Sequence, residues 1–132
     1  MSEIVIQRDV YLSVQDFVDV LRRSGLHERR PVDDLPRIAA MLDCANLILT
    51  ARKDGQIIGV ARSVTDFAYC CYCSDLAVDR DFQKQGIGKK LLEATKAALH
   101  REAKLFLISA PGAISYYEHI GMKRQERCFE MK

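Results

Sequence analysis

Two glycines at the start of an expected helix are the part of the chain best suited to chemistry. Gly86 and Gly88 follow a polar loop and precede a long amphipathic segment. A helix start exposes unpaired backbone N–H groups and the positive end of the helix dipole, and glycine lets an anion approach them closely. Lys84, Lys89 and Lys90 add positive charge at the same place. The pattern therefore predicts a site for a phosphate or pyrophosphate group.

Taken alone, this glycine pair is a weak signal. The chain has neither a GxxxxGK[ST] loop nor a GxGxxG segment after the first strand of a βαβ unit. Many helices begin near a glycine for steric reasons, so a structural role is the simpler interpretation of the pair by itself. A nucleotide-binding α/β protein is the corresponding functional alternative, and it predicts that ATP or NAD competes for the site.

The full spacing resembles a known family. Residues 76–78 (LAV) are short and apolar, and residues 83–88 (QKQGIG) resemble the [Q/R]-x-x-G-x-[G/A] acetyl-CoA signature of the GNAT superfamily of N-acyltransferases. Residues 113–122 (AISYYEHIGM) look like the A-x-x-[F/Y]-Y-x-x-x-G-[F/M] segment of the same family. The two motifs stand in the family's order, separated by a helix and a strand, and the resemblance covers residues 46–122 well.

The resemblance implies an N-acetyltransferase that transfers an acetyl group from acetyl-CoA to a primary amine, in a small molecule or a protein, by direct transfer in a ternary complex. By family position, the Leu76 N–H would polarise the thioester carbonyl and the Tyr117 phenol would protonate the leaving thiolate. A phenol suits the latter role because it is neutral and protonated at pH 7. The residues expected to contact the cofactor are Leu76, Ala77, Val78, Gln83, Lys84, Gln85, Gly86, Ile87, Gly88, Lys89, Lys90, Ser109, Tyr116 and Tyr117.

The general base stays open at this stage. Some members of the resembled family use a glutamate on the strand before the cofactor loop, and that register gives Tyr72 here. Asp75 is near, and strand alternation predicts that it faces away from Tyr72. We favour a structural role for Asp75 over action through a water molecule, and an amine that arrives neutral would need no base. Many relatives also bind pantetheine with an asparagine after the fifth strand, where this chain has Ala110 beside Ser109.

The first half of the chain predicts two helices after a short strand at residues 4–6. Ser13 can cap the first helix, Gly25 would end it, and Asp34 can cap the second. In the resembled family, these helices and their connector form one wall of the acceptor site. Arg29 and Arg30, like His27, lie on that connector, although a solvated loop is the simpler interpretation of such a charged run.

The second half predicts an α/β arrangement in a single domain, residues 1–132. Asp54-Gly55 between two apolar runs predicts a hairpin, and residues 69–78 would add a third antiparallel strand. A helix from Gly88 to about Glu102 then crosses over to a continuous apolar run at residues 105–109, expected as a central strand parallel to residues 69–78. The resemblance implies a mixed sheet of six or seven strands, about four helices, and a splayed parallel strand pair whose backbone binds pantetheine.

Composition limits the other function classes. The net charge is +2 over 132 residues, which gives no reason to expect nucleic-acid or membrane binding. Five cysteines, an odd number, and the absence of a signal-like N-terminal segment favour a reduced, cytoplasmic protein. Cys70 and Cys71 should point to opposite faces of a strand, so the CCxC run is expected to hold buried thiols and no metal.

Two further expectations concern function beyond the cofactor. A non-catalytic module that binds or senses acyl-CoA would keep the same glycine loop and strand, so it is the alternative to an enzyme. The segment after Gly121 is short for the two-strand hairpin that usually ends relatives. A single last strand would leave an open edge or pair with a second subunit, which makes a homodimer an expectation.

Overall fold

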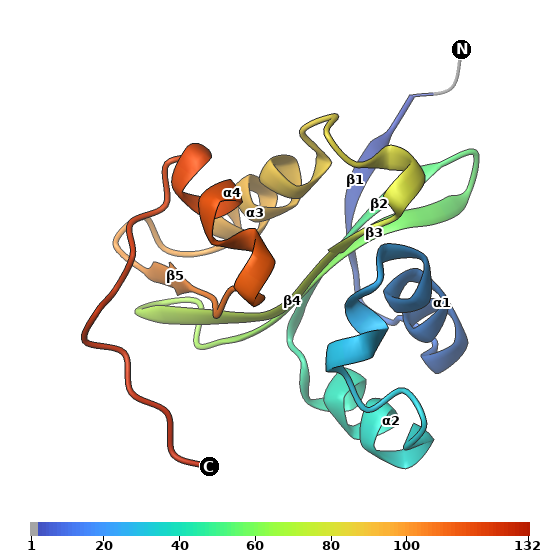
Figure 1. The fold of residues 1–132 in the computed structure, drawn as a ribbon, viewed down its shortest axis with the longest axis horizontal. Coiled ribbons are helices and arrows are strands. Elements are labelled where there is room, and N and C mark those ends of the chain that lie inside the picture. Colours follow the sequence, from blue (N-terminus) through green and yellow to red (C-terminus); the bar gives the residue numbers. More distant parts are fainter. Residues whose placement is uncertain (1–2) are drawn as a thin grey trace.

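The computed structural model describes residues 3–132, and one mixed sheet organises them (Figure 1). The strands lie in the order β1-β2-β3-β4-β5; the first four pair antiparallel, and β5 runs parallel to β4. Their bounds are Val5–Asp9, Leu47–Lys53, Gln56–Thr65, Cys70–Val78 and Lys104–Phe106. The α/β class and the parallel junction agree with the sequence prediction, whereas the expected six or seven strands are five.

Helices cover both faces of this sheet. In Figure 1, α1 and α2 lie on one side of the sheet, and α3 and α4 lie on the other. Their bounds are Val14–Ser24, Leu35–Cys44, Ile87–Ala97 and Ile114–His119, and short 3₁₀ turns η1, η2 and η3 span Leu26–Arg29, Arg80–Phe82 and Pro111–Ala113. Within residues 3–132, every helix is too short or too polar to cross a bilayer.

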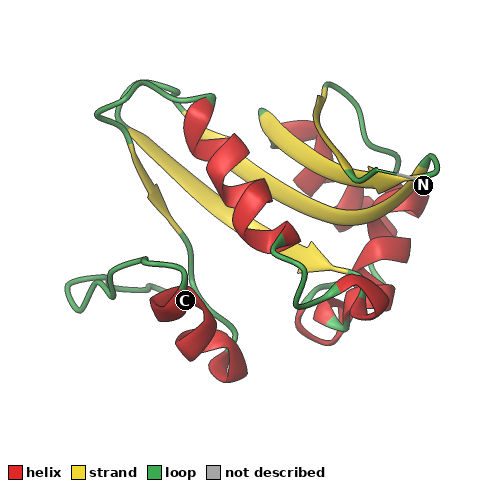
Figure 2. Ribbon diagram, turned by 90° about the horizontal axis from the view of Figure 1, so that it is seen from above, coloured by secondary structure: helices red, strands yellow, loops and turns green. Residues whose placement is uncertain are grey.

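Each face of the sheet has its own apolar core. Side chains from β2, β3 and α3 form the α3-side core, which includes the fully buried Leu47, Ile58 and Leu91. Side chains from α1, α2 and β3 form the α1-side core, which includes Phe17, Leu21, Ile38 and Val60. The sheet separates the two cores, so apolar side chains pack against both of its faces and hold the strands near the expected site (Figure 2).

The predicted helix signals around α1 and α2 are confirmed. The Ser13 hydroxyl accepts a hydrogen bond from the Asp16 N–H at 3.1 Å, and Gly25 ends α1 in the left-handed conformation with φ of 88°. The Asp34 carboxylate accepts from the Arg37 N–H at 3.2 Å. Each contact satisfies a backbone group that the helix itself leaves unpaired.

The predicted hairpin between β2 and β3 is also confirmed. Asp54 and Gly55 form its two-residue turn with φ of 52° and 79°. Positive φ at both central residues is the geometry whose twist matches that of antiparallel strands, and Asp-Gly tolerates it well.

Three expectations about the C-terminal half were wrong. Helix α3 ends at Ala97, five residues earlier than expected. The His100 N–H donates to the Phe67 carbonyl at 2.8 Å, outside the helix, so the helical hydrogen bonding does not continue to His100. Strand β5 is an edge strand of three residues, and the exposed side chains of Phe106 (41%) and Ile108 (57%) show why it is not central. Among residues 3–132 no strand follows β5, so the expected last strand is missing.

Strand β4 contains a one-residue bulge. Arg62 of β3 pairs with Asp75, but the next residue of β3, Ser63, pairs with Cys73, so Ser74 is left without a partner across the ladder. A bulge of this kind bends the strand and shifts the alternation of its side chains by one residue.

The bulge therefore changes which face each β4 residue meets. Cys73 packs in the α3-side core, whereas Ala77, an even number of positions later, packs in the α1-side core. Tyr72 and Asp75 consequently share the α1 side of the sheet. The expectation that they face apart was wrong, because simple alternation does not account for an extra residue.

Candidate active site

The pairing between β4 and β5 stops early and leaves the rest of β4 open on that side. Only Cys70–Tyr72 pair with Lys104–Phe106, although β4 continues to Val78. The last paired residue of β4 is two positions before the bulge at Ser74. The strand pair that the sequence resemblance implied as splayed thus parts next to the irregularity in β4.

Hydrogen bonding to β3 fixes which backbone groups face this open side. The Asp79 N–H donates to the Ile58 carbonyl at 2.8 Å, so the preceding residue, Val78, belongs to a non-hydrogen-bonded pair with β3. Val78, and Leu76 two residues earlier, therefore point their N–H and C=O groups away from β3. These are the groups a strand offers to an extended ligand lying beside it.

One of these groups already has a side-chain partner. The Gln83 amide donates to the Val78 carbonyl at 3.0 Å, across the exposed turn that follows β4. Gln83 was expected to contact the cofactor directly. In the free protein it ties the loop back to the end of β4, so a ligand amide would compete with it for the same carbonyl.

The start of helix α3 has the features of an anion site. Gly86 occupies the N-cap position with φ of 80° and offers no side chain to cap the helix, and the first intrahelical bond runs from the Lys90 N–H to the Gly86 carbonyl. A Cβ built on Gly86 meets nothing within 4 Å. Lys84, Lys89 and Lys90 are exposed around this end. The N–H groups, the dipole and the lysines together favour a phosphate.

Tyr116 stands directly over this helix start. A Cβ built on Gly88 would lie 2.6 Å from the Tyr116 hydroxyl oxygen and 3.8 Å from Cδ2 of Leu76. Burial raises the pKa of Tyr116, and a hydrogen bond with the backbone of Lys89 partly offsets that rise. Gly88 is thus required by close approach, and the phenol occupies the anion-binding end of α3 in the free protein.

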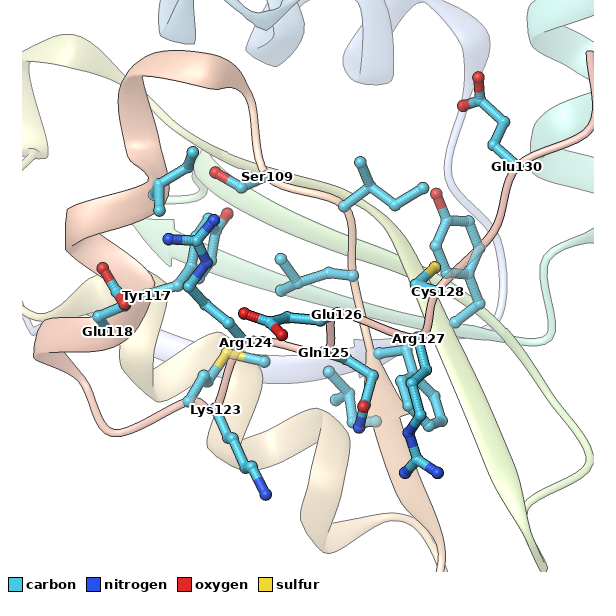
Figure 3. A pocket seen from close by; sticks show the side chains of 17 residues that line it. Ser109, Tyr117, Glu118, Lys123, Arg124, Gln125, Glu126, Arg127, Cys128 and Glu130 are labelled. Atoms are coloured by element: carbon cyan, nitrogen blue, oxygen red, sulfur yellow. The ribbon is translucent and has the colours of Figure 1, made fainter.

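Tyr117 points elsewhere, toward a cavity of about 700 Å³ (Figure 3). Its ring meets that of Tyr116 edge to face, with centroids 5.2 Å apart. Burial raises the pKa of Tyr117 to about 12; Cys73 and Tyr116 add to the rise, and the positive charge of Arg30 partly offsets it. At neutral pH, Tyr117 is therefore a protonated hydrogen-bond donor in a half-buried position.

The cavity brings several of the predicted residues together and leaves others outside it. Tyr72, Ser109 and Tyr117 line it, with residues of β5, α4 and the segment after Met122. Figure 3 shows side chains of that segment, Lys123 to Cys128, across the cavity. The glycine loop and Leu76 do not line it. Tyr116 connects the two parts, because its ring meets that of Tyr117 and its hydroxyl lies over Gly88.

Asp75 is held by two arginines. Its carboxylate, fully buried, accepts hydrogen bonds from Arg30, which precedes α2, and from Arg62 of β3. Both carboxylate oxygens are occupied by cations, which favours the structural role. No sequence signal pointed to these partners, because Arg30 and Arg62 lie 45 and 13 residues away from Asp75 along the chain.

The cysteines do not form a metal site within the described part of the chain. No group of three or more metal-binding side chains gathers among residues 3–132. Cys70 is exposed and Cys71 is buried, as strand alternation predicted. Burial raises the pKa of the Cys71 thiol, and it raises that of Cys73 to about 12. Both thiols behave as small apolar groups.

Comparison with known proteins decides the family. The sequence profile of the acetyltransferase (GNAT) family matches residues 14–122. The chain belongs to this family. An uncharacterised N-acetyltransferase, ycf52, from Gracilaria tenuistipitata var. liui is 28% identical over 124 residues, which cover 86% of this chain and 66% of the relative. The chloroplastic GCN5-related N-acetyltransferase 2 of Arabidopsis thaliana is 30% identical over 74 residues, 54% of this chain and 29% of that protein.

Solved structures show the same fold. The aminoglycoside N-acetyltransferase AAC(6')-Iy, solved in complex with CoA, superimposes with a TM-score of 0.76 at 17% identity, over 100% of this chain and 95% of that one. This chain spans about two thirds or less of the two curated relatives named above. Acetyl-CoA is the cofactor of the GNAT family. The start of α3, once Tyr116 moves from it, and the unpaired edge of β4 fit such a ligand, because they offer N–H groups to a diphosphate and a strand edge to an amide-bearing arm.

Proposed function

We propose that this GNAT chain transfers the acetyl group of acetyl-CoA to a primary amine. One observation supports this most directly. Leu76 and Val78 turn their backbone groups to the unpaired side of β4, and α3 begins with a glycine N-cap after the loop that follows. The strand edge offers groups that can pair with an amide-bearing arm, and the helix start offers N–H groups to an anion.

Most of the chain's contribution to holding the cofactor comes from its backbone. The N–H groups of residues 87–89 and the charges of Lys84, Lys89 and Lys90 would hold the diphosphate, while Val78 would pair with the pantetheine arm. Ile87 is buried under the loop and fixes it to the α3-side core. Tyr116 must leave the helix start, or share it, when an anion binds there. Gln85 and Ala77 shape the loop and the strand around these groups.

The reaction needs a polarised carbonyl and a donor for the departing sulfur. When bound, acetyl-CoA supplies the activated acetyl thioester. The N–H of Leu76 would donate a hydrogen bond to the carbonyl oxygen, and such donors stabilise the negative charge that develops there. The Tyr117 hydroxyl would donate to the sulfur, with Ser109 beside it on the cavity wall.

The structure offers no free carboxylate for the general base at the position expected from the sequence. Asp75 is paired with two guanidiniums, so it does not act as the base in this proposal. Tyr72 is 41% exposed and lines the cavity with Tyr117. We therefore infer that the acceptor amine arrives neutral or loses its proton to solvent.

Acceptor identity, assembly and compartment stay predictions. Charged side chains of both signs line the cavity, so they do not select a cationic or anionic acceptor. They are Glu118, Glu126 and Glu130, and Lys123, Arg124 and Arg127. A small-molecule amine or a protein amine both fit the proposal. A homodimer and a cytoplasmic location remain as the sequence predicted them.

Calorimetric binding of acetyl-CoA tests the cofactor assignment. Wild type should bind acetyl-CoA, with ATP and NAD failing to displace it, and Gly86→Glu should abolish binding by placing a carboxylate at the diphosphate position. Gly55→Glu is the matched control, because Gly55 has φ of 79° and open space, as Gly86 does, but lies on the β2–β3 turn. A folded wild type that ignores acetyl-CoA would refute the proposal.

Tyr117→Phe separates an enzyme from a non-catalytic acyl-CoA-binding module. If Tyr117 donates to the sulfur, kcat should fall about 100-fold, the lower end of acid–base contributions, while acetyl-CoA affinity stays within about twofold. Tyr69→Phe is the control, because Tyr69 is 79% exposed. An amine screen that follows free thiol release provides the assay. Tight acetyl-CoA binding without turnover of any amine would favour the binding module.

A further inference from the structure

We propose that Arg30 is a positioning residue that holds the β4 bulge and thereby orients the strand edge that the cofactor uses. The inference rests on the proposed function. It concerns a residue whose expected alternatives were contact with the acceptor or simple exposure to solvent. The structure instead directs its side chain into the sheet, toward Ser74 and Asp75.

Two of the three hydrogen bonds of the Arg30 side chain reach the irregular part of β4. One guanidinium nitrogen donates to the Asp75 carboxylate, and Nη2 donates to the Ser74 carbonyl at 2.7 Å. The third nitrogen donates to the Arg29 carbonyl at 2.8 Å, which closes the side chain onto its own loop. Ser74 is the residue that the β3–β4 ladder skips. Arg30 therefore supplies, from outside the sheet, a partner for the carbonyl of the bulge residue.

Arg62 also binds Asp75, so the three side chains next to the bulge form one charged group, the Arg30–Asp75–Arg62 cluster. The Arg62 side chain is 7% exposed, donates to the second Asp75 oxygen, and reaches the Met41 carbonyl of α2 at 3.0 Å. The cluster thus joins the α1–α2 connector, α2, β3 and β4. It holds two cations and one anion, so one positive charge is uncompensated within it.

The position of the bulge along β4 explains how the cluster can affect cofactor binding. The bulge at Ser74 lies between the last residue paired with β5, Tyr72, and the first residue with a proposed role, Leu76. Without the bulge, Leu76 would face the other core and the open edge would present different groups. The charge of Arg30 also reaches Tyr117, whose pKa it lowers in part. One side chain thus influences both the strand edge and the proposed proton donor.

The test compares Arg30→Met with a neighbour. Methionine keeps the length and the apolar stem, and Asp75 retains Arg62, so the variant should fold. Arg29→Met is the matched control, because Arg29 is exposed and its side chain forms no hydrogen bond or ion pair among residues 3–132. The first readout uses the free protein: amide hydrogen exchange at Ala77 of β4 and at Asp79 directly after it, whose N–H groups point toward β3, referenced to the paired residues Leu49 of β2 and Ala61 of β3. The second is acetyl-CoA affinity by calorimetry.

Arg30→Met should speed exchange at Ala77 and Asp79 at least about tenfold while Leu49 and Ala61 change little. It should also weaken acetyl-CoA binding about tenfold, the size expected for one lost charge-assisted contact. Arg29→Met should match wild type in both. Arg30→Lys should resemble Arg30→Met, because an ammonium does not reproduce the planar fork that reaches two acceptors.

Three results would overturn the inference. Unchanged exchange and affinity in Arg30→Met would reduce Arg30 to a surface ion pair. Faster exchange spread equally over β2 and β3 would make it a general stabilising residue. Full recovery in Arg30→Lys would show that charge alone matters. If wild type itself fails to bind acetyl-CoA, the proposed function fails first, and the role of Arg30 toward the cofactor fails with it.

Discussion

Tyr116 and Tyr117 are adjacent, but their surroundings separate them. Neighbouring residues on a helix point about 100° apart, so one ring reaches the start of α3 while the other turns to the cavity. Burial raises the pKa of both phenols, and that of Tyr117 reaches about 12. The sequence motif singled out both tyrosines, but it did not indicate that Tyr116 would occupy the end of α3. That contact depends on how α4 packs, which no local pattern encodes.

The raised pKa of Tyr117 gives a pH prediction. A general acid must be protonated to act, so enzyme activity falls as the pH rises through the pKa of that acid. For Tyr117, this fall is expected near pH 12. We expect kcat/KM to rise with pH as the free acceptor amine becomes neutral, and kcat to show no fall up to about pH 10. Steady-state kinetics from pH 6.5 to 10.5 would check this. A descending limb centred near 10, the ordinary value for tyrosine, would contradict it.

At the scale of elements, the sequence predicted what local contacts determine. The caps of α1 and α2 and the Asp54-Gly55 turn each depend on neighbours within a few residues, and they are present as expected. The end of α3, the length of β5 and the bulge at Ser74 depend on partners far along the chain, such as Phe67 for His100. These were the features missed, and two of them shape the candidate site.

Gly59 of β3 offers a test of packing between elements. A Cβ there would lie 3.1 Å from Leu91, 3.3 Å from the Ala77 carbonyl oxygen and 3.4 Å from Ala51. Gly59→Ala should therefore lower the free energy of unfolding by about 1–3 kcal/mol, since backbone and core atoms must shift. Urea denaturation provides the measurement. Gly112→Ala, in open space, should stay within about 0.5 kcal/mol, and equal effects of the two would show that β3 adapts freely.

Over the whole molecule, the sheet separates two apolar cores, and the five cysteines differ in whether they lie in one of these cores. Cys71 and Cys73 lie in the α3-side core, whereas Cys44, Cys70 and Cys128 are exposed. The sequence predicted that Cys70 and Cys71 diverge, because strand alternation is a strong local rule, but the expectation of buried thiols was wrong for Cys70, which is exposed. It could not predict the two-core partition, which depends on the packing of both helix pairs.

A thiol titration follows from that arrangement. The native protein should react quickly with a disulfide reagent at three cysteines, because burial raises the pKa of Cys71 and Cys73 and shields them. In guanidinium chloride, all five should react. Fast reaction of four or five thiols in the native protein would show that β4 opens readily from the α3-side core.

The extra residue in β4 also constrains how this chain can change in length during evolution. Deleting Ser74 would restore simple alternation and rotate everything after it, sending Asp75 toward apolar neighbours and removing Leu76 from its place. The exposed segment after Met122 has no such register to keep. The fold should therefore tolerate insertions and deletions in the tail, where they would change one wall of the cavity. The loss of a single codon within β4 would instead turn half of the strand over.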